Sequence, residues 1–122
     1  MTWMAEPEAH DFPAAVAYLS LLASTADIDA AVAQWRSASV VHQKAKDILR
    51  ATRLALLPRD NPHVASDLAK IHKGHALSPV LLVRGDLSVD RPAQIADGYH
   101  RVCASYWTAE NTDIPCLIAQ LD

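Results

Sequence analysis

The sequence predicts an α/β fold in which the first half of the chain supplies helices and the second half supplies a β-sheet. Between residues 13 and 52, apolar residues recur at the spacing of helices with one buried face. Residues 79–83 are instead a short run of Val and Leu without polar alternation, as in a strand buried on both faces. Another short run, 94–96, ends at Asp97-Gly98, a pair typical of turns, and a helical pattern starts directly after it.

The composition is that of one globular domain spanning residues 1–122, with 51% hydrophobic and 20% charged residues. Within it we expect a helical part over 11–53 and an α/β core over 54–119. The formal net charge of −3 argues against a protein that holds DNA by charge alone, although a local basic cluster leaves nucleic-acid binding open.

The N-terminal segment and the cysteines favour a cytoplasmic protein that does not enter a membrane. The first residues are acidic and lack the basic start of a secretory signal, and the longest apolar stretch, 14–23, is too short to cross a bilayer. Cys103 and Cys116 have apolar neighbours and are expected to be small core residues in a reducing compartment, with a disulfide between them as the alternative.

Three helices are predicted in the first half of the chain. Asp11 and Pro13 resemble an N-cap and a first-turn proline, which opens a helix over 13–24. A second helix over 28–36 carries Ile28, Val32 and Trp35 on its inner side. The third, over 39–52, is basic on its outer side, which is either a solvated surface or a cover that brings a cation to a phosphate site.

The second half alternates short strands with two further helices. The apolar run 54–57 fits a first strand or a helix end, and periodicity does not separate the two. A helix over 64–72 ends at Gly74. The strand over 79–83 is followed by a polar, hairpin-like connection over 85–92 and a strand over 94–96, then by the helix after Gly98 and a last strand over 114–119.

The segment 95–104 is the strongest candidate for a binding site. His100 and Arg101 lie in the first turn of the expected helix, where a cation is unfavourable to the helix dipole. The same helix start offers free N–H groups to an anion, so we expect this pair to face a negative group, most simply a phosphate. The alternative is that both side chains are solvated and that Asp97 only caps the helix.

The motif Asp97-Gly98-Tyr99-His100-Arg101, followed by a helix and the strand 114–118, resembles the signature of the ParB/sulfiredoxin superfamily. The upstream segment 58–64 is similar to the Asn-Pro segment that opens ParB-type domains, so the resemblance covers residues 54–119. It implies a small mixed β-sheet of ParB/sulfiredoxin type, with the helical N-terminal half packed against it.

The resemblance also implies roles for individual residues. Gly98, Tyr99, His100 and Arg101 occupy the turn that contacts nucleotide phosphates in relatives, and a guanidinium offers paired donors to phosphate oxygens. Residues lining the nucleotide pocket in relatives match His63 and Ser66, and Lys70 lies one helical turn further on.

Two departures limit what the resemblance implies about activity. Tyr99 stands where sulfiredoxins have their cysteine nucleophile, so repair of sulfinic acids is not expected. The sequence has no helix-turn-helix segment after its last strand, so DNA recognition in the manner of ParB partition proteins is not expected either.

The predicted ligand is a nucleotide, ATP or CTP, or another phosphorylated small molecule, with Mg²⁺ arriving on the nucleotide phosphates. ATPase or kinase-like activity is open, and Asp60 and Asp97 are the carboxylates placed to act as base or metal ligand in such a reaction. His72 and His75 flank Gly74 without a completing ligand, so no resident metal site is expected. The alternatives are an antitoxin-like interaction module with a protein partner and a metal-dependent nuclease.

Overall fold

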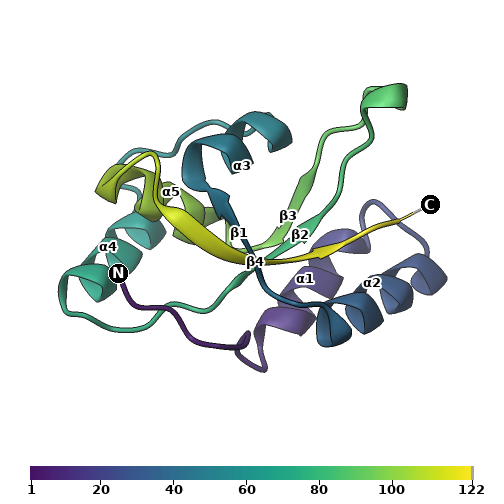
Figure 1. Cartoon of the computed structure of the whole chain (residues 1–122), viewed down its shortest axis with the longest axis horizontal. Helices are drawn as coiled ribbons and strands as arrows, with labels where there is room; N and C mark the ends of the chain where they lie inside the picture. Colours follow the sequence, from purple (N-terminus) through teal and green to yellow (C-terminus); the bar gives the residue numbers. More distant parts are fainter. Residues whose placement is uncertain (122) are drawn as a thin grey trace.

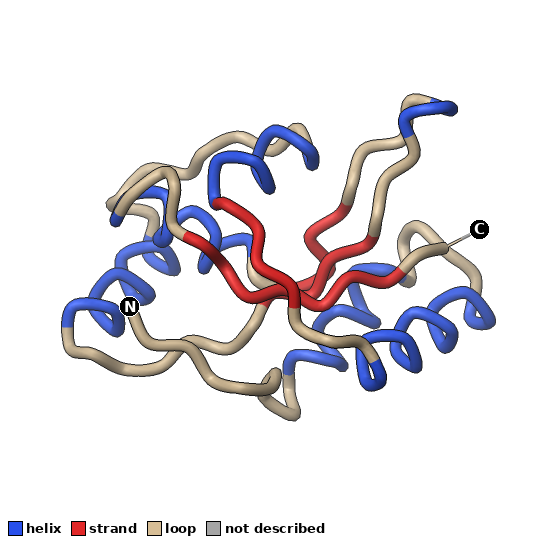
Figure 2. The backbone as a smooth tube through the Cα atoms, in the orientation of Figure 1, coloured by secondary structure: helices blue, strands red, loops and turns tan. Residues whose placement is uncertain are grey.

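In the computed structural model, which describes residues 1–121, helices cover both faces of a four-stranded sheet (Figures 1 and 2). The helices are α1 (Asp11–Leu19), α2 (Thr25–Ser37), α3 (Ala45–Thr52), α4 (Pro62–His72) and α5 (Tyr99–Thr108), with a short 3₁₀ helix η1 (Leu87–Val89). The strands are β1 (Val41–Lys44), β2 (Val80–Val83), β3 (Gln94–Asp97) and β4 (Asp113–Ala119).

The sheet is mixed and has the order β1-β4-β2-β3. The two central strands, β2 and β4, run parallel, and each outer strand pairs antiparallel with its neighbour. β2 and β3 are joined by the arm that carries η1, so the hairpin-like connection predicted over 85–92 is confirmed. The predicted α/β class with a small mixed sheet is therefore correct.

Central strand β2 separates two hydrophobic cores. Val80 and Leu82 face the core built with α3, α4 and α5, whereas Leu81 and Val83 face the core built with α1 and α2. All four side chains are buried, which explains why the strand reads as an unbroken apolar run. Cys103 and Cys116 are buried free thiols in the first core, as predicted.

The N-terminal helices differ from the prediction at their ends. α1 begins at Asp11 and ends at Leu19, so the predicted helix over 13–24 starts too late and runs too far. The chain must reverse before α2 so that both helices can pack on one sheet face, and Ser24 caps α2 by accepting from the N–H of Asp27. Asp11 is not an N-cap but the first, buried residue of α1.

The predicted helix over 39–52 is wrong in its first third. Val41–Lys44 form strand β1, which pairs with β4, and the helix begins only at Ala45. The buried face of α3 consists of Ala45, Ile48, Leu49 and Thr52, whereas Val41 is an exposed strand residue. The two β-branched residues Val40 and Val41 favour an extended backbone.

Neither alternative for the run 54–57 is correct: α3 ends at Thr52, and the segment is irregular and pairs with no strand. It lies along α5 instead: the indole N–H of Trp107 donates to the carbonyl of Leu57 at 2.8 Å, and Leu56 and Leu57 pack against the first core. The residues 54–57 are therefore apolar because the segment packs against a helix, and not because it pairs in the sheet. Among the described helices none is long and apolar enough to span a membrane.

Candidate functional site

A polar pocket of about 190 Å³ lies between α4 and the turn that joins β3 to α5. It brings together side chains from two segments that are distant in the sequence. The lining residues are His63, Ser66, Asp67 and Lys70 from the first segment and Asp97, Gly98, His100 and Arg101 from the second. Most of the residues predicted for a phosphate site therefore share one cavity.

Two local features set the backbone around this pocket. Gly98 has φ +114° and ψ +16°, in the left-handed region, and a Cβ there would lie 2.9 Å from a methyl group of Val80. Glycine thus allows β3 to turn tightly into α5. On the other side, the side chain of Asn61 accepts from the N–H groups of His63 and Val64 and fixes the start of α4.

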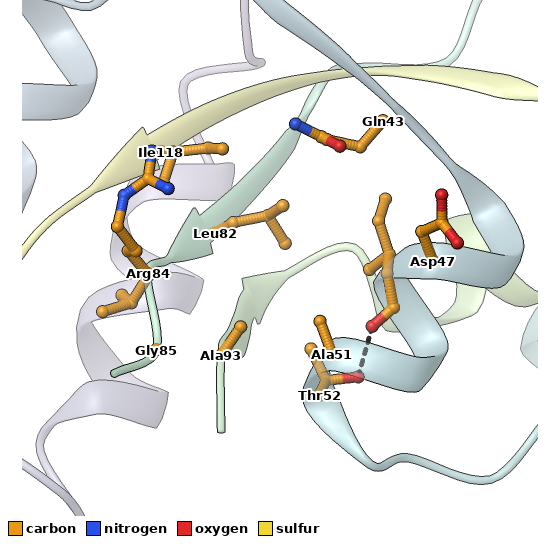
Figure 3. Close-up of a pocket in the computed structure, with 11 residues that line it drawn as sticks. Gln43, Asp47, Ala51, Thr52, Leu82, Arg84, Gly85, Ala93 and Ile118 are labelled. Atoms are coloured by element: carbon orange, nitrogen blue, oxygen red, sulfur yellow. Dashed lines mark hydrogen bonds between the residues drawn. The ribbon is translucent and has the colours of Figure 1, made fainter. Parts of the chain in front are cut away.

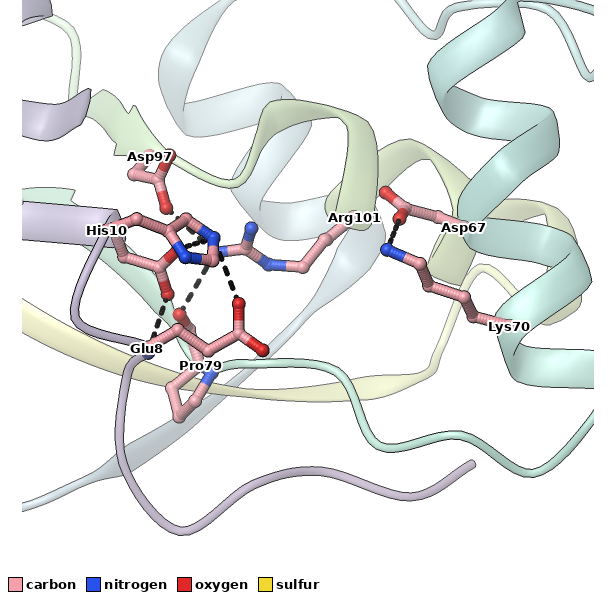
Figure 4. A network of polar contacts seen from close by, with 8 residues as sticks. Glu8, His10, Asp67, Lys70, Pro79, Asp97 and Arg101 are labelled. Atoms are coloured by element: carbon pink, nitrogen blue, oxygen red, sulfur yellow. Dashed lines mark hydrogen bonds and ion pairs between the residues drawn. The ribbon is translucent and has the colours of Figure 1, made fainter.

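Arg101 is neither solvated nor free in this structure. Its Nη2 atom donates to the carboxylate of Asp97 at 3.1 Å and to the carbonyl of Pro79 at 3.2 Å (Figure 4). The side chain is only 15% exposed, and its buried Nε has no hydrogen-bond partner among the described residues. A buried donor without an acceptor costs roughly 1–3 kcal/mol, so this guanidinium has capacity for a further acceptor.

The carboxyl of Asp97 pairs with Arg101 and does not cap α5, whose N-cap is Gly98 without a side-chain bond. Burial raises the pKa of Asp97, the guanidinium of Arg101 opposes that rise, and the neighbouring carboxyl of Asp11 adds to it. The alternative interpretation of Asp97 as a helix cap is therefore incorrect. Its function in the structure is to hold Arg101.

Asp67 is the pocket residue that sequence reasoning missed. Its carboxylate is 14% exposed and lies 3.8 Å from the ammonium of Lys70. Burial raises the pKa of Asp67, against the opposing charges of Lys70 and Arg101. The spacing of His63, Asp67 and Lys70 places all three on one helical face, and that spacing could have identified Asp67.

Two histidines face each other at the mouth of the pocket. The ring centroids of His63 and His100 are 4.7 Å apart, and the ring of Tyr99 stacks on His100 at 5.8 Å. The pKa of His100 is lowered, first by burial and then by the positive charge of a protonated His63, while Asp67 acts in the opposite direction. An anion between the rings would favour the charged imidazole.

The lowered pKa of His100 predicts a pH-dependent stability. Because the folded chain takes up this proton at a lower pH than the unfolded chain does, the contribution of His100 is full above pH 6.5 and is lost as the pH falls through the folded value. His100→Gln is therefore expected to flatten the loss of stability below pH 6.5. Urea unfolding between pH 5 and 8 measures the free energy of unfolding of the wild-type chain, of His100→Gln and of the control His72→Gln, which replaces an exposed histidine. If this free energy fell equally with pH in all three proteins, the contribution assigned to His100 would be contradicted.

Two predicted site residues do not line the pocket. Asp60 lies exposed on the turn before α4. Tyr99 donates its hydroxyl to the carbonyl of Ala55, and burial raises its pKa, so its side chain covers the 54–57 segment. Of the two carboxylates predicted as the base or metal ligand, Asp97 lines the pocket and Asp60 does not.

The basic outer side predicted for 39–52 does not reach the pocket either. Lys44 pairs with Asp113 at 3.5 Å, Arg50 with Asp47 at 3.7 Å, and Arg53 pairs with Asp90. α3 packs on β1 and α5 and lines a separate cavity. Of the two alternatives for this basic surface, the structure therefore favours a solvated helix face over a cover for the phosphate site.

Glu8, His10 and Asp11 form a second polar group. Figure 4 shows Glu8 and His10 near the end of the Arg101 side chain. The imidazole Nε2 of His10 is 2.9 Å from Glu8 and 3.4 Å from Asp11, and the backbone N–H of Glu8 donates to Asp11 at 3.0 Å. The polar atoms of the three side chains all lie within 4.8 Å of one another. We assign no metal ligand in residues 1–121.

A more apolar cavity of about 250 Å³ lies between α3 and the sheet, beside the base of the β2–β3 arm (Figure 3). Its walls include Ile48, Leu82 and Ile118, with Gln43 and Thr52 at the edge. The hydroxyl of Thr52 donates to the carbonyl of Ile48 at 2.8 Å and is thereby occupied. The cavity contains no pair of groups arranged for proton transfer or nucleophilic attack.

Comparisons with protein-family models, with curated proteins and with solved structures give no significant match to this chain. The resemblance to the ParB/sulfiredoxin superfamily therefore stays a prediction from the motifs around Gly98 and Asn61.

Proposed function

We propose that this chain binds a phosphate-containing anion, the phosphate of a nucleotide or of another phosphorylated small molecule, in the pocket between α4 and α5. The observation that carries the proposal is the convergence of His63, Ser66 and Lys70 with His100 and Arg101 around one cavity. These side chains offer hydroxyl, imidazole, ammonium and guanidinium donors, the groups that bind phosphate oxygens. The start of α5 adds its free backbone N–H groups.

The size of the cavity favours recognition of the phosphate group over recognition of the base. Pockets that enclose a whole small-molecule ligand occupy about 300–1,000 Å³, whereas this one measures about 190 Å³. A phosphoryl group fits within such a volume, and a nucleoside would extend beyond it. We therefore propose that the pocket recognises the phosphate group itself, and that ATP or CTP are candidate ligands because they contain it.

Two of the cations at the pocket are paired with carboxylates, Lys70 with Asp67 and Arg101 with Asp97. A phosphate must compete with both carboxylates for these cations. Burial raises the pKa of each carboxyl and so weakens its negative charge toward lower pH, which favours the incoming anion. Anion affinity is therefore expected to increase as the pH falls.

A thermal-shift panel tests the proposal directly, with ATP, ADP, CTP, GTP and inorganic phosphate, each with and without Mg²⁺. A ligand at one hundred times its dissociation constant stabilises the folded state by about 2.7 kcal/mol, or several degrees for a domain of this size. We expect Arg101→Ala to abolish the shift. Arg101→Lys should restore only part of it, because an ammonium lacks the paired donors of a guanidinium.

Replacing the buried Arg101 could itself impair folding, so two further variants distinguish a loss of binding from a folding defect. Lys70→Ala removes an exposed lining residue and is expected to reduce the shift. Arg50→Ala removes a more exposed cation on α3, outside the pocket, that also pairs with an aspartate at i−3, and should leave the shift unchanged. A flat panel for the wild-type chain, or an equal loss in Arg50→Ala, would refute phosphate binding at this pocket.

The interaction-module alternative has one observation in its favour. Leu87 is 97% exposed and Val89 60% exposed at the tip of the β2–β3 arm, which projects from the sheet (Figure 1). Exposed apolar residues on a projecting arm suit contact with another protein.

For a nuclease no specific observation exists, since Asp60 and Asp97 do not share the pocket. Under the primary proposal the fold would be that of a ParB/sulfiredoxin-type nucleotide-binding domain.

A further inference from the structure

The apolar cavity between α3 and the sheet is separate from the phosphate pocket. It measures about 250 Å³, and none of its lining residues is shared with the pocket between α4 and α5. An apolar cavity of about 150 Å³ is large enough to admit a benzene molecule. The cavity beside α3 therefore has room for the body of a small organic molecule.

Contacts between α3 and the β2–β3 arm hold the walls of this cavity in place. The N–H of Ala93, at the base of the arm, donates to the carbonyl of Ala51 in the last turn of α3 at 3.1 Å. Farther along the arm, Arg53 pairs with Asp90. A ligand therefore meets a preformed site and spends little of its binding free energy on ordering the arm.

The inner surface of the cavity suits a hydrocarbon group. Ile48 and Leu82 are buried in the first core, and Ile118 packs against it. The hydroxyl of Thr52 already donates to the carbonyl of Ile48. A hydroxyl or amide group of a ligand placed among these side chains would lose its hydrogen bonds to water without replacement, which is unfavourable.

The charged residues that line the cavity favour an anionic ligand. They are Asp47 and Arg84, both exposed. The carboxylate of Asp47 already pairs with Arg50 at 3.7 Å. Arg84 forms no ion pair within residues 1–121. The guanidinium of Arg84 is therefore available to the negative group of a ligand.

The strand geometry places Arg84 on the same face of the sheet as the cavity. The N–H of Arg84 donates to the carbonyl of Ala119 at 2.8 Å, so the parallel pairing with β4 continues one residue beyond the end of β2. Because side chains alternate along a strand, Arg84 lies on the face of Leu82. Figure 3 shows its guanidinium beside Ile118, with the amide of Gln43 extending toward that side of the cavity.

We propose that this cavity binds a small organic monocarboxylate, whose apolar body contacts Ile48, Leu82 and Ile118 and whose carboxylate pairs with Arg84. A guanidinium offers paired donors in the geometry of a carboxylate, and the amide of Gln43 is a further donor. The inference does not depend on phosphate binding between α4 and α5, since the two sites have no residue in common.

Three probes of similar shape and different charge test the proposal on the wild-type chain: benzoate, benzyl alcohol and benzylamine. In an NMR titration at neutral pH, benzoate should shift the methyl signals of Ile48, Leu82 and Ile118 in a saturable manner. We expect benzyl alcohol to bind about tenfold more weakly, the size of one hydrogen bond to a charged group. Benzylamine should bind more weakly still, because its ammonium faces the charge of Arg84.

Three variants locate the carboxylate. Arg84→Gln should weaken benzoate binding about tenfold and leave the affinity for benzyl alcohol unchanged. Arg91→Gln is the matched control, because Arg91 is also exposed, and it lines a cavity on the α1–α2 face that Arg84 borders as well; benzoate binding should persist in it. Ala51→Leu adds a larger side chain at the cavity wall and should abolish binding of both probes. Ala51 is exposed on α3, so the fold should tolerate the change.

A preference for benzoate that disappears in Arg84→Gln and persists in Arg91→Gln would support the proposal. The absence of saturable shifts at the three apolar residues would overturn it. Equal affinities for the three probes would also overturn it, since the cavity would then not recognise a carboxylate. An equal loss of benzoate binding in Arg91→Gln would place the anion on the opposite face of the sheet and would overturn it too.

Discussion

Replacing Trp35 with alanine is expected to lower the free energy of unfolding by roughly 3–5 kcal/mol, the usual cost of removing a buried aromatic side chain. Trp35 is 1% exposed on α2, packs in the core shared with α1, and donates its indole N–H to the carbonyl of Leu82 at 2.9 Å. The substitution removes both the packing and the bond that ties α2 to the central strand. Urea unfolding followed by circular dichroism measures the loss.

Two companion variants divide this effect into its parts. Trp35→Phe keeps much of the ring volume but leaves the carbonyl of Leu82 without this donor, and should cost less than the alanine variant. Leu22→Ala truncates an exposed leucine near the end of α1 and should change stability by no more than about 0.5 kcal/mol. A loss below about 1 kcal/mol in Trp35→Ala would contradict the packing of α2 against the sheet.

Gly98→Ala is expected to destabilise the fold by roughly 2–4 kcal/mol, because backbone strain and a steric clash act at one position. With φ at +114°, an added Cβ would lie 2.9 and 3.1 Å from the methyl groups of Val80 and 3.0 Å from Nη2 of Arg101. Val80 is fully buried and cannot move aside without disturbing the core. The same Cβ would displace Arg101, so the phosphate-induced thermal shift should also be lost.

Gly74→Ala is the matched control for this variant. Gly74 also has a positive φ, +77°, but a Cβ there would meet no atom within 4 Å. Its replacement should therefore cost only the left-handed backbone penalty, about 1 kcal/mol, and leave phosphate binding intact. Equal losses in the two variants would show that Val80 and Arg101 do not crowd Gly98 as described.

The sequence predicted those parts of the fold whose pattern has a local cause. The run at Val80–Val83 reads as a central strand because both of its faces are buried, and Gly98 marks a turn because few other residues adopt its backbone conformation. β1 was missed because Val41–Lys44 is an exposed edge strand, whose residues show no alternation of buried and exposed positions. Only its pairing with β4, far along the chain, makes it a strand.

The same distinction holds for the pocket. His100 and Arg101 were predicted from a local motif, and His63, Ser66 and Lys70 came from the family resemblance. Asp11, by contrast, looks like an ordinary helix cap in the sequence, and its carboxyl is buried at the place where α1 packs against β3. Contacts of that kind depend on tertiary structure and leave no periodic pattern.

The position of β4 in the sheet has a consequence for how the chain assembles. β4 is the last strand in the sequence, yet it lies between β1 and β2. Among the strands of residues 1–121, only the β2–β3 hairpin can form from neighbouring segments. β1 has no partner until residues 113–119 exist, and contacts so distant in sequence form slowly. During synthesis, Val41–Lys44 therefore form an unpaired segment that a chaperone or a second chain can reach.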